Sequence, residues 1–134
     1  MLSIAIYSDQ ETDVKNLKSI IQDFLIEMKM MAKVSHFNIP EAIMTAPGSY
    51  DIYIMDMDSK DDVLDLGRKM RTIDSGSNFI YISSDLSVAH LVAKARAGYF
   101  LMKPLDSTEI LEVLKEIKQT IQYDNIVIKM ANGE

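Results

Sequence analysis

The segment DIYIMDMD, residues 51–58, decides the fold, because an apolar run of strand length, Ile52 to Met55, ends directly in acidic residues. A run so nearly continuous in apolar side chains is typical of a parallel sheet that helices cover on both faces. Three further runs have this character, and a weaker, alternating one predicts an edge strand. The three are Leu2 to Tyr7, Phe79 to Ile82 and Tyr99 to Met102, and the weaker one is Lys33 to Phe37.

Segments with helical periodicity separate these runs. In the first and last of them the apolar residues fall on one face: Val14, Leu17, Ile21, Phe24, Leu25 and Met28, then Ile110, Val113, Leu114, Ile117 and Ile121. Shorter helical patterns cover Pro40 to Ala46, Asp61 to Arg71 and Ser87 to Ala97. This alternation predicts an α/β fold, (βα)5, with a doubly wound five-stranded parallel sheet and right-handed crossovers.

The composition excludes several classes of function. The 134 residues suit one domain, and the absence of cysteine excludes a disulfide scaffold and a thiolate-based site. A net charge of −6 has the wrong sign for a domain that binds nucleic acid by itself. The first residues lack the basic start of a signal peptide, and no stretch is apolar enough to span a membrane, which predicts a soluble, cytoplasmic protein.

Reactive side chains follow four of the five predicted strands. Asp9 follows the first, Asp56 the third, Ser83 the fourth and Lys103 the fifth. Each alone is common after a strand, because such residues favour turns and helix caps or lie in solvent. With a sheet order of 2-1-3-4-5, however, the two acids become neighbours, and the hydroxyl and the ammonium flank them at the carboxyl edge, where ligands of such sheets bind.

These four residue types suit the chemistry of a phosphoryl group. Two adjacent carboxylates repel unless a cation lies between them, and hard oxygen ligands suit Mg²⁺. A lysine and a hydroxyl supply the charge and hydrogen bond that a phosphoryl group requires. We therefore expect Asp56 to act as a nucleophile that forms an aspartyl phosphate, with Lys103 binding a phosphoryl oxygen.

Three stretches resemble the receiver domains of two-component response regulators. They are GYFLMKP (98–104), YDIYIMD (50–56) and FIYIS (79–83), and the resemblance covers about residues 2 to 123. It implies the flavodoxin-like receiver fold, a Lys103-Pro104 peptide bond that is often cis, and a signalling role limited to self-phosphorylation and autodephosphorylation rather than enzymatic turnover.

The resemblance also assigns roles to residues. It implies that a sensor histidine kinase phosphorylates Asp56, with Mg²⁺ held by Asp9, Asp56 and the backbone carbonyl of Asp58. Ser83 would then move toward the phosphoryl group and Phe100 would turn inward. That change would remodel the face of the fourth helix, fifth strand and fifth helix, through which two protomers commonly pair.

Two departures from the family's pattern affect the site. Ser8 stands where the family usually has a second acid, which predicts weakened binding of Mg²⁺. The loop Asp58 to Asp62 lacks the usual proline and glycine, and an acidic Asp58 near the phosphoryl group could disfavour it or alter its hydrolysis. These departures favour a second reading, a receiver-like interaction module that works without phosphorylation.

A third reading is an enzyme. Asp56-Met57-Asp58 also resembles the Asp-x-Asp motif of haloacid-dehalogenase-type phosphatases, although that motif normally follows the first strand of a longer chain. His36 as a phosphocarrier is less expected than His36 as a packed or surface residue.

The tail predicts a second unit after the receiver. Ile126 to Met130 looks like a strand, and Asn132-Gly133 is a hairpin signal. The tail is similar to the segment that opens the β-rich DNA-binding domain of LytTR-type transcriptional regulators. We therefore expect a receiver at residues 1–123, and a linker and the start of a DNA-binding domain at residues 124–134, with the DNA contacts beyond Glu134.

Overall fold

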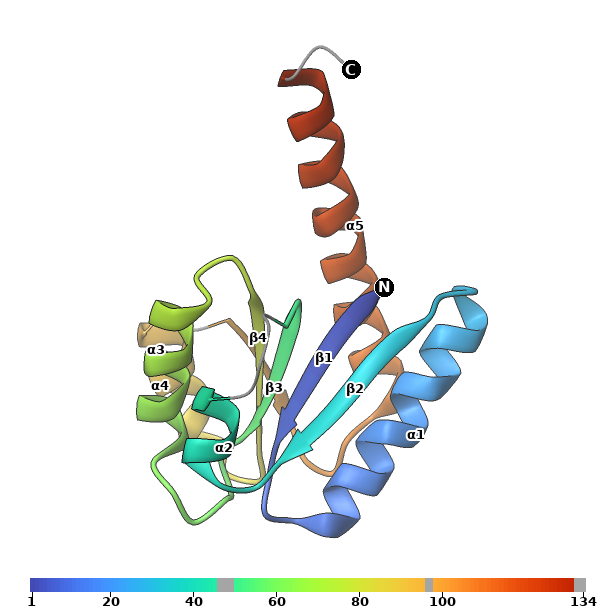
Figure 1. Ribbon diagram of the computed structural model, residues 1–134. Coiled ribbons are helices and arrows are strands. Elements are labelled where there is room, and N and C mark those ends of the chain that lie inside the picture. Colours follow the sequence, from blue (N-terminus) through green and yellow to red (C-terminus); the bar gives the residue numbers. More distant parts are fainter. Residues whose placement is uncertain (46–49, 96–97, 132–134) are drawn as a thin grey trace.

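The computed structural model describes residues 1–45, 50–95 and 98–131, with side chains up to residue 121. In these ranges strands and helices alternate (Figure 1). The elements are β1 (Leu2–Tyr7), α1 (Glu11–Glu27), β2 (Ala32–Phe37), α2 (Pro40–Thr45), β3 (Ile52–Asp56), α3 (Val63–Ile73), β4 (Asn78–Ser83), α4 (Ser87–Lys94), β5 (Tyr99–Met102) and α5 (Ser107–Ala131). The predicted (βα)5 fold is confirmed.

The five strands form one sheet in the order β2-β1-β3-β4-β5, and the paired strands are all parallel. The register pairs Tyr7 with Met55, Asp56 with Ile82 and Ser83 with Met102. All carboxyl ends therefore meet at one edge of the sheet, as the order 2-1-3-4-5 predicted.

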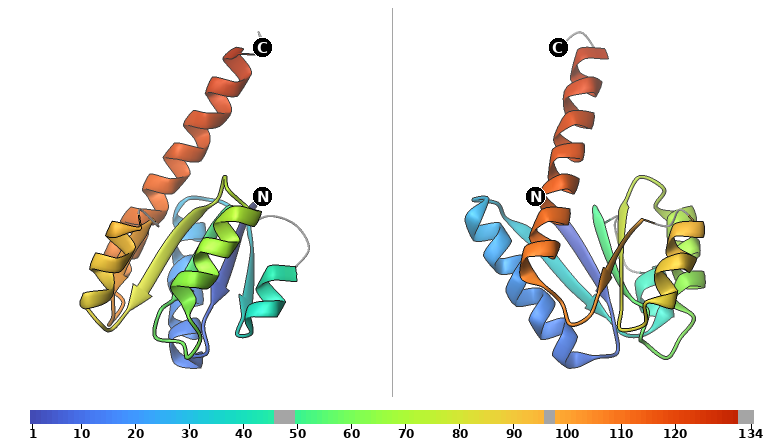
Figure 2. Two further views of the ribbon diagram at one scale, coloured as in Figure 1. Left: turned by 90° about the vertical axis from the view of Figure 1, so that its left-hand side faces the viewer. Right: turned by 180° about the vertical axis from the view of Figure 1, so that it is seen from behind.

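Helices cover both faces of the sheet, with α1 and α5 on one face and α2, α3 and α4 on the other (Figure 2). The face toward α1 and α5 is built from isoleucines of β1, β3 and β4, such as Ile6 and Ile54. The opposite face is aromatic, and the rings of Tyr53 and Phe79 stack with centroids 4.9 Å apart. Because apolar side chains are needed on both faces, the strands are apolar almost throughout.

The bounds of two helices differ from the predicted ones. α3 begins at Val63 rather than Asp61, because the Asp62 side chain caps the helix by accepting a hydrogen bond from the Asp65 amide at 3.1 Å. α4 ends at Lys94, before the predicted Ala97. The segment between β3 and α3 is thereby left as a loop at the edge where the reactive side chains lie.

The predicted strand at Ile126 to Met130 is wrong, because these residues continue α5 (Figure 1). β-branched residues favour strands, but a strand needs a hydrogen-bonding neighbour, whereas an existing helix gains one hydrogen bond for each residue added. Figure 1 shows α5 running past the amino ends of the strands. The Asn132-Gly133 pair lies outside the described residues. Within the described part of the chain, no helix is both long and apolar enough to cross a membrane.

Candidate functional site

Asp56 is the last residue of β3, and its side chain is 0% exposed. Its Oδ2 accepts a hydrogen bond of 2.6 Å from the Ser8 hydroxyl at the end of β1. Its Oδ1 accepts from the Lys103 ammonium at 2.8 Å and from the Asp58 amide at 3.0 Å. Groups after two other strands and the loop after β3 therefore hold this buried carboxylate in one orientation.

Lys103 follows β5 and is the centre of charge in the site. Its Nζ lies 2.7 Å from Asp13 Oδ2, 2.8 Å from Asp56 Oδ1 and 3.0 Å from Asp58 Oδ2. Burial opposes the charge, but the hydrogen bonds from Nζ to the three carboxylates outweigh it and raise the pKa of Lys103 above its usual value. Three carboxylates share one ammonium, which leaves two negative charges uncompensated in this neighbourhood.

Asp58 turns its side chain into the site rather than into solvent. Its Oδ1 accepts from the Ser83 hydroxyl at 2.8 Å, and its Oδ2 accepts from the Ser84 amide at 2.9 Å and contacts Lys103. Burial acts to raise the pKa of Asp58, but hydrogen bonds from Ser83, Lys103 and Ser84 outweigh it and keep the pKa below the usual value. The carboxylate is therefore ionised and bound by three donors.

Asp9 faces the loop after β3. Its Oδ2 accepts from the Lys60 amide at 3.0 Å and its Oδ1 from Gln10 Nε2 at 2.7 Å, while its own amide donates to the Ser59 hydroxyl at 3.1 Å. The hydrogen bond from the Lys60 amide is the main reason that the pKa of Asp9 is lowered. Asp9 thus ties the end of β1 to the loop that carries Asp58.

The donor chemistry fits Mg²⁺, although the carboxylates do not gather into a metal cluster. Among the residues that the structure describes, no three His, Asp or Glu side chains are grouped so as to hold a metal ion. Mg²⁺ is usually bound by only one or two carboxylates, together with water and phosphate oxygens. Asp9, Asp56 and the Asp58 carbonyl offer oxygen ligands of this kind, and the surplus negative charge around Lys103 favours a cation.

The structure therefore brings together most residues that the sequence singled out. Asp56, Asp58, Ser83 and Lys103 form one hydrogen-bonded group, which Ser8 joins through Asp56. Asp58 takes part through its side chain, which the sequence predicted to lie near the phosphoryl group, and through its backbone amide. The resemblance had assigned its backbone carbonyl to the metal.

Phe100, the predicted switch residue, lies on β5, two strands away from Asp56 on β3. It pairs with Tyr81 in the β4–β5 register and is partly buried. Its side chain packs against the aromatic face of the core that includes Tyr81 and Val92. The ring is therefore already in contact with the interior.

Two residues of the site were not anticipated. Asp13 lies in the first turn of α1, and an acid there was the available signal, although acids are common in a first helical turn because they complement the helix dipole. Ser59 is only 6% exposed, and its hydroxyl accepts from the Asp9 amide. A small polar residue in an acidic loop gave no comparable signal.

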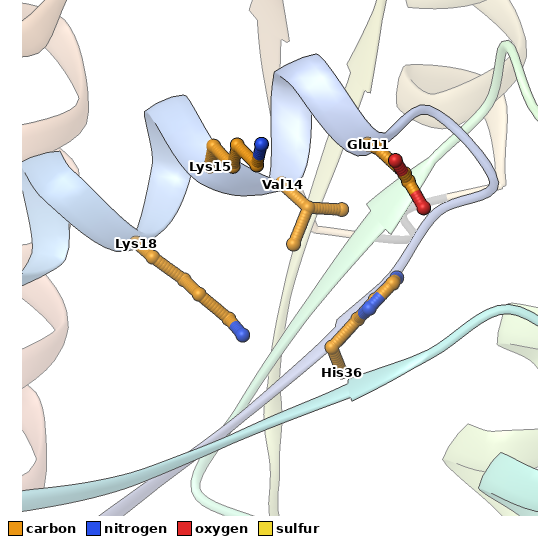
Figure 3. Close-up of a pocket in the computed structure, with 5 residues that line it drawn as sticks. All are labelled: Glu11, Val14, Lys15, Lys18 and His36. Carbon is orange, nitrogen blue, oxygen red and sulfur yellow. The ribbon is translucent and has the colours of Figure 1, made fainter.

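Figure 3 shows a separate pocket between α1 and β2, lined by Glu11, Val14, Lys15, Lys18 and His36. The Nε2 of His36 lies 2.8 Å from the backbone carbonyl of Ser8. Since a carbonyl can only accept, this ring nitrogen carries the proton. His36 thus holds the segment after β1 in place, which agrees with its interpretation as a packed residue.

Comparison with known proteins supports the fold. No protein-family model matches the sequence, and no curated protein matches it either. Among solved structures, the receiver domain of a DNA-binding response regulator from Colwellia psychrerythraea has a TM-score of 0.73 at 16% identity, covering 89% of this chain and 99% of that one. A response regulator receiver domain from Clostridium thermocellum has a TM-score of 0.70 at 16% identity, covering 95% and 99%.

A different kind of protein shares the fold. A pilus assembly protein from Burkholderia thailandensis has a TM-score of 0.71 at 21% identity, covering 89% of this chain and 99% of that one. Identities this low establish similarity of fold and not of activity. The chain thus has the flavodoxin-like fold of response regulator receiver domains.

Proposed function

We propose that this chain is a phospho-accepting receiver domain of a two-component system, acting in the cytoplasm. In this proposal Asp56 takes a phosphoryl group from the phosphohistidine of a sensor histidine kinase. The observation that carries it is the 2.8 Å contact between the fully buried Asp56 carboxylate and the Lys103 ammonium at the carboxyl edge of the sheet, with the Ser83 hydroxyl in the same group.

The residues present can perform this transfer. A carboxylate oxygen of Asp56 forms the new O–P bond as the N–P bond of phosphohistidine breaks, and the leaving imidazole nitrogen takes up a proton. Lys103 and the donors now bound to Asp58 hold the phosphoryl oxygens. Asp9, Asp56 and the Asp58 carbonyl would hold Mg²⁺, which would supply the positive charge that two negative groups in contact require.

Incubation with acetyl phosphate and Mg²⁺, followed by intact-mass measurement, tests the proposal. We expect an adduct of one phosphoryl group in the wild type and in Glu41→Gln, a matched change of an exposed acid outside the site. The adduct should be absent in Asp56→Asn and when EDTA replaces Mg²⁺. Failure of the wild type to form it at saturating reagent would refute phosphorylation of Asp56.

The second candidate is a receiver-like module that binds a protein partner without phosphorylation. It is favoured by the engagement of both Asp56 oxygens and by the Asp58 carboxylate, which already binds Ser83 and Lys103. This candidate predicts no adduct in the wild type, and partner binding that Asp56→Asn leaves unchanged. The phosphatase reading instead predicts turnover of a generic phosphomonoester that Asp58→Asn abolishes.

We also propose that phosphorylation of the receiver controls its pairing and transcription. Phosphorylation would remodel the α4-β5-α5 face, favour a homodimer through it and regulate transcription through a DNA-binding domain beyond the receiver. The expected strand at 126–130 no longer supports a domain of the LytTR type, because α5 continues through those residues. Light scattering with and without acetyl phosphate tests the homodimer. A coding sequence beyond Glu134 without a DNA-binding domain would refute the transcriptional part.

A further inference from the structure

Three donors from two strands converge on the Asp58 side chain. Ser83 and Ser84 come from the end of β4 and Lys103 from the end of β5, and their contacts to the carboxylate measure 2.8, 2.9 and 3.0 Å. Donors of these types, a hydroxyl, an amide and an ammonium, form an anion-binding site. Here the bound anion is part of the chain.

This anion lies next to the proposed phosphoacceptor. The Asp58 amide donates to Asp56 Oδ1 at 3.0 Å, and Lys103 bridges the two carboxylates. A phosphoryl group on Asp56 would need the same ammonium and the same neighbouring donors. The carboxylate and the phosphoryl group are therefore competitors for one position.

The surrounding residues are already arranged around an anion. The Ser83 side chain is 0% exposed, and its hydroxyl donates to Asp58 while accepting from the Asp85 amide at 3.0 Å. This pair of bonds directs the hydroxyl proton of Ser83 toward Asp58. Phe100, one strand away, packs against the aromatic core.

We propose that the Asp58 carboxylate is an internal stand-in for the phosphoryl group, which holds Ser83, Ser84 and Lys103 in their anion-bound arrangement while Asp56 is unmodified. This role rests on the proposed function, which identifies the group that Asp58 replaces as a phosphoryl group. It places these three donors of the unmodified domain where a phosphoryl group would hold them, and it makes loading of Asp56 depend on outward rotation of the Asp58 side chain.

Rotation of this side chain does not require the loop to unfold. The next residue, Ser59, is anchored by the Asp9 amide, and its own amide donates to the Asp56 carbonyl at 3.2 Å. The Asp58 side chain is 23% exposed, so solvent is open to it on one side. An arriving dianionic phosphoryl group would repel the carboxylate and favour that rotation.

The first experiment uses no phosphodonor. Amide NMR spectra of the wild type are compared with those of Asp58→Ala, Asp58→Asn and Asp65→Ala, a control that removes an equal charge from the exposed surface of α3. We expect the Ser84 amide to lose its hydrogen-bonded shift and its protection from exchange in Asp58→Ala, and amides around Phe100 to move with it. Asp58→Asn should show a partial effect, because its amide oxygen still accepts but carries no charge.

The second experiment adds beryllofluoride and Mg²⁺, an analogue of the phosphoryl group. Asp58→Ala should bind it with a Kd about tenfold lower than that of the wild type, since no internal anion has to leave. Binding should return the Ser84 amide of Asp58→Ala to its wild-type position, and should move that amide much less in the wild type.

The outcomes separate this proposal from the proposed function. Unchanged Ser84 and Phe100 amides in Asp58→Ala, or equal beryllofluoride affinity, would overturn the stand-in role even if Asp56 is phosphorylated. If neither beryllofluoride nor acetyl phosphate reacts with any variant, phosphorylation of Asp56 fails, and the comparison of free spectra still decides whether Asp58 sets the state of Ser84. Should Asp58→Ala not fold, the isosteric Asp58→Asn replaces it, with the partial shift of the Ser84 amide as the expected result and an unchanged amide as the result that overturns the proposal.

Discussion

Replacement of Lys103 by methionine removes the only cation seen in contact with the site's carboxylates in the described structure. The buried Asp56 would keep its hydrogen bonds from Ser8 and from the Asp58 amide but lose its countercharge. Breaking a buried ion pair by removing one partner costs about 3 to 5 kcal/mol. We expect Lys103→Met to lose stability in this range, which lowers the Tm by about 10 °C or more for a domain of this size.

Removal of the opposite partner should behave differently. Asp56→Asn leaves Lys103 with two carboxylates, at 2.7 and 3.0 Å, and relieves repulsion among three acids. Its stability should therefore stay within about 1 kcal/mol of the wild type or rise. Urea unfolding at neutral pH, without added Mg²⁺, measures both variants.

A surface pair provides the matched control. Lys69 lies 3.1 Å from Asp65 on α3, and both side chains are about half exposed, at 58% and 49%. Lys69→Met should cost less than about 1 kcal/mol. Equal losses for Lys103→Met and Asp56→Asn, or a loss for Lys103→Met no larger than for Lys69→Met, would refute the argument that surplus negative charge governs this site.

Two further predictions concern packing and metal affinity. Among the described residues, Tyr81 Oη is buried without a hydrogen-bond partner, so Tyr81→Phe should stabilise the domain by about 1 kcal/mol in urea unfolding. A Cβ at Gly67 would clash with that hydroxyl, so Gly67→Ala should cost about 1 to 3 kcal/mol. The double variant should regain only part of this loss, because the ring carbons Cζ and Cε1 would still lie 3.0 and 3.1 Å from the added Cβ. Ser8→Asp puts a second acid beside Asp56, so its Tm should fall in the absence of Mg²⁺. As Mg²⁺ is added, its Tm should rise more steeply than that of the wild type. An equal rise in Tm for both proteins would contradict this expectation.

The strands of the core were predictable because their side chains are apolar almost without interruption. A strand buried on both faces leaves no polar alternation, so Leu2 to Tyr7 and Tyr99 to Met102 were identified with the bounds that the structure has. The apolar pattern of residues 126–130 also predicted a strand, and that prediction was wrong. β-branched residues predict a strand only where a neighbouring strand exists, and α5 instead continues through them.

The candidate site was predictable as far as it depends on strand ends. Asp56, Ser83 and Lys103 are placed by sheet order alone, because their positions follow from where β3, β4 and β5 stop. The direction of the Asp58 side chain depends on loop geometry, which periodicity does not encode. Asp13 depends on how α1 is rotated against the sheet, and this too is set by packing rather than by local sequence.

The two departures noted in the sequence act on the site in the same direction. A second acid at Ser8 would place negative charge beside Asp56, where it attracts a cation, whereas Ser8 donates a 2.6 Å hydrogen bond that satisfies the carboxylate without one. The acid at Asp58 instead faces Lys103 and Ser83, where it takes the place of an incoming anion. An acid at the end of β1 would favour binding of the metal, whereas an acid in the loop opposes binding of the phosphoryl group. Moving one carboxylate between these two places therefore changes which ion the site binds without changing its total charge. The combination of Ser8 and Asp58 therefore predicts a domain that is held in one state by its own side chains. Asp56 of this domain should be phosphorylated more slowly than in Ser8→Asp/Asp58→Ala, the double variant that adds an acid at position 8 and removes the acid at position 58.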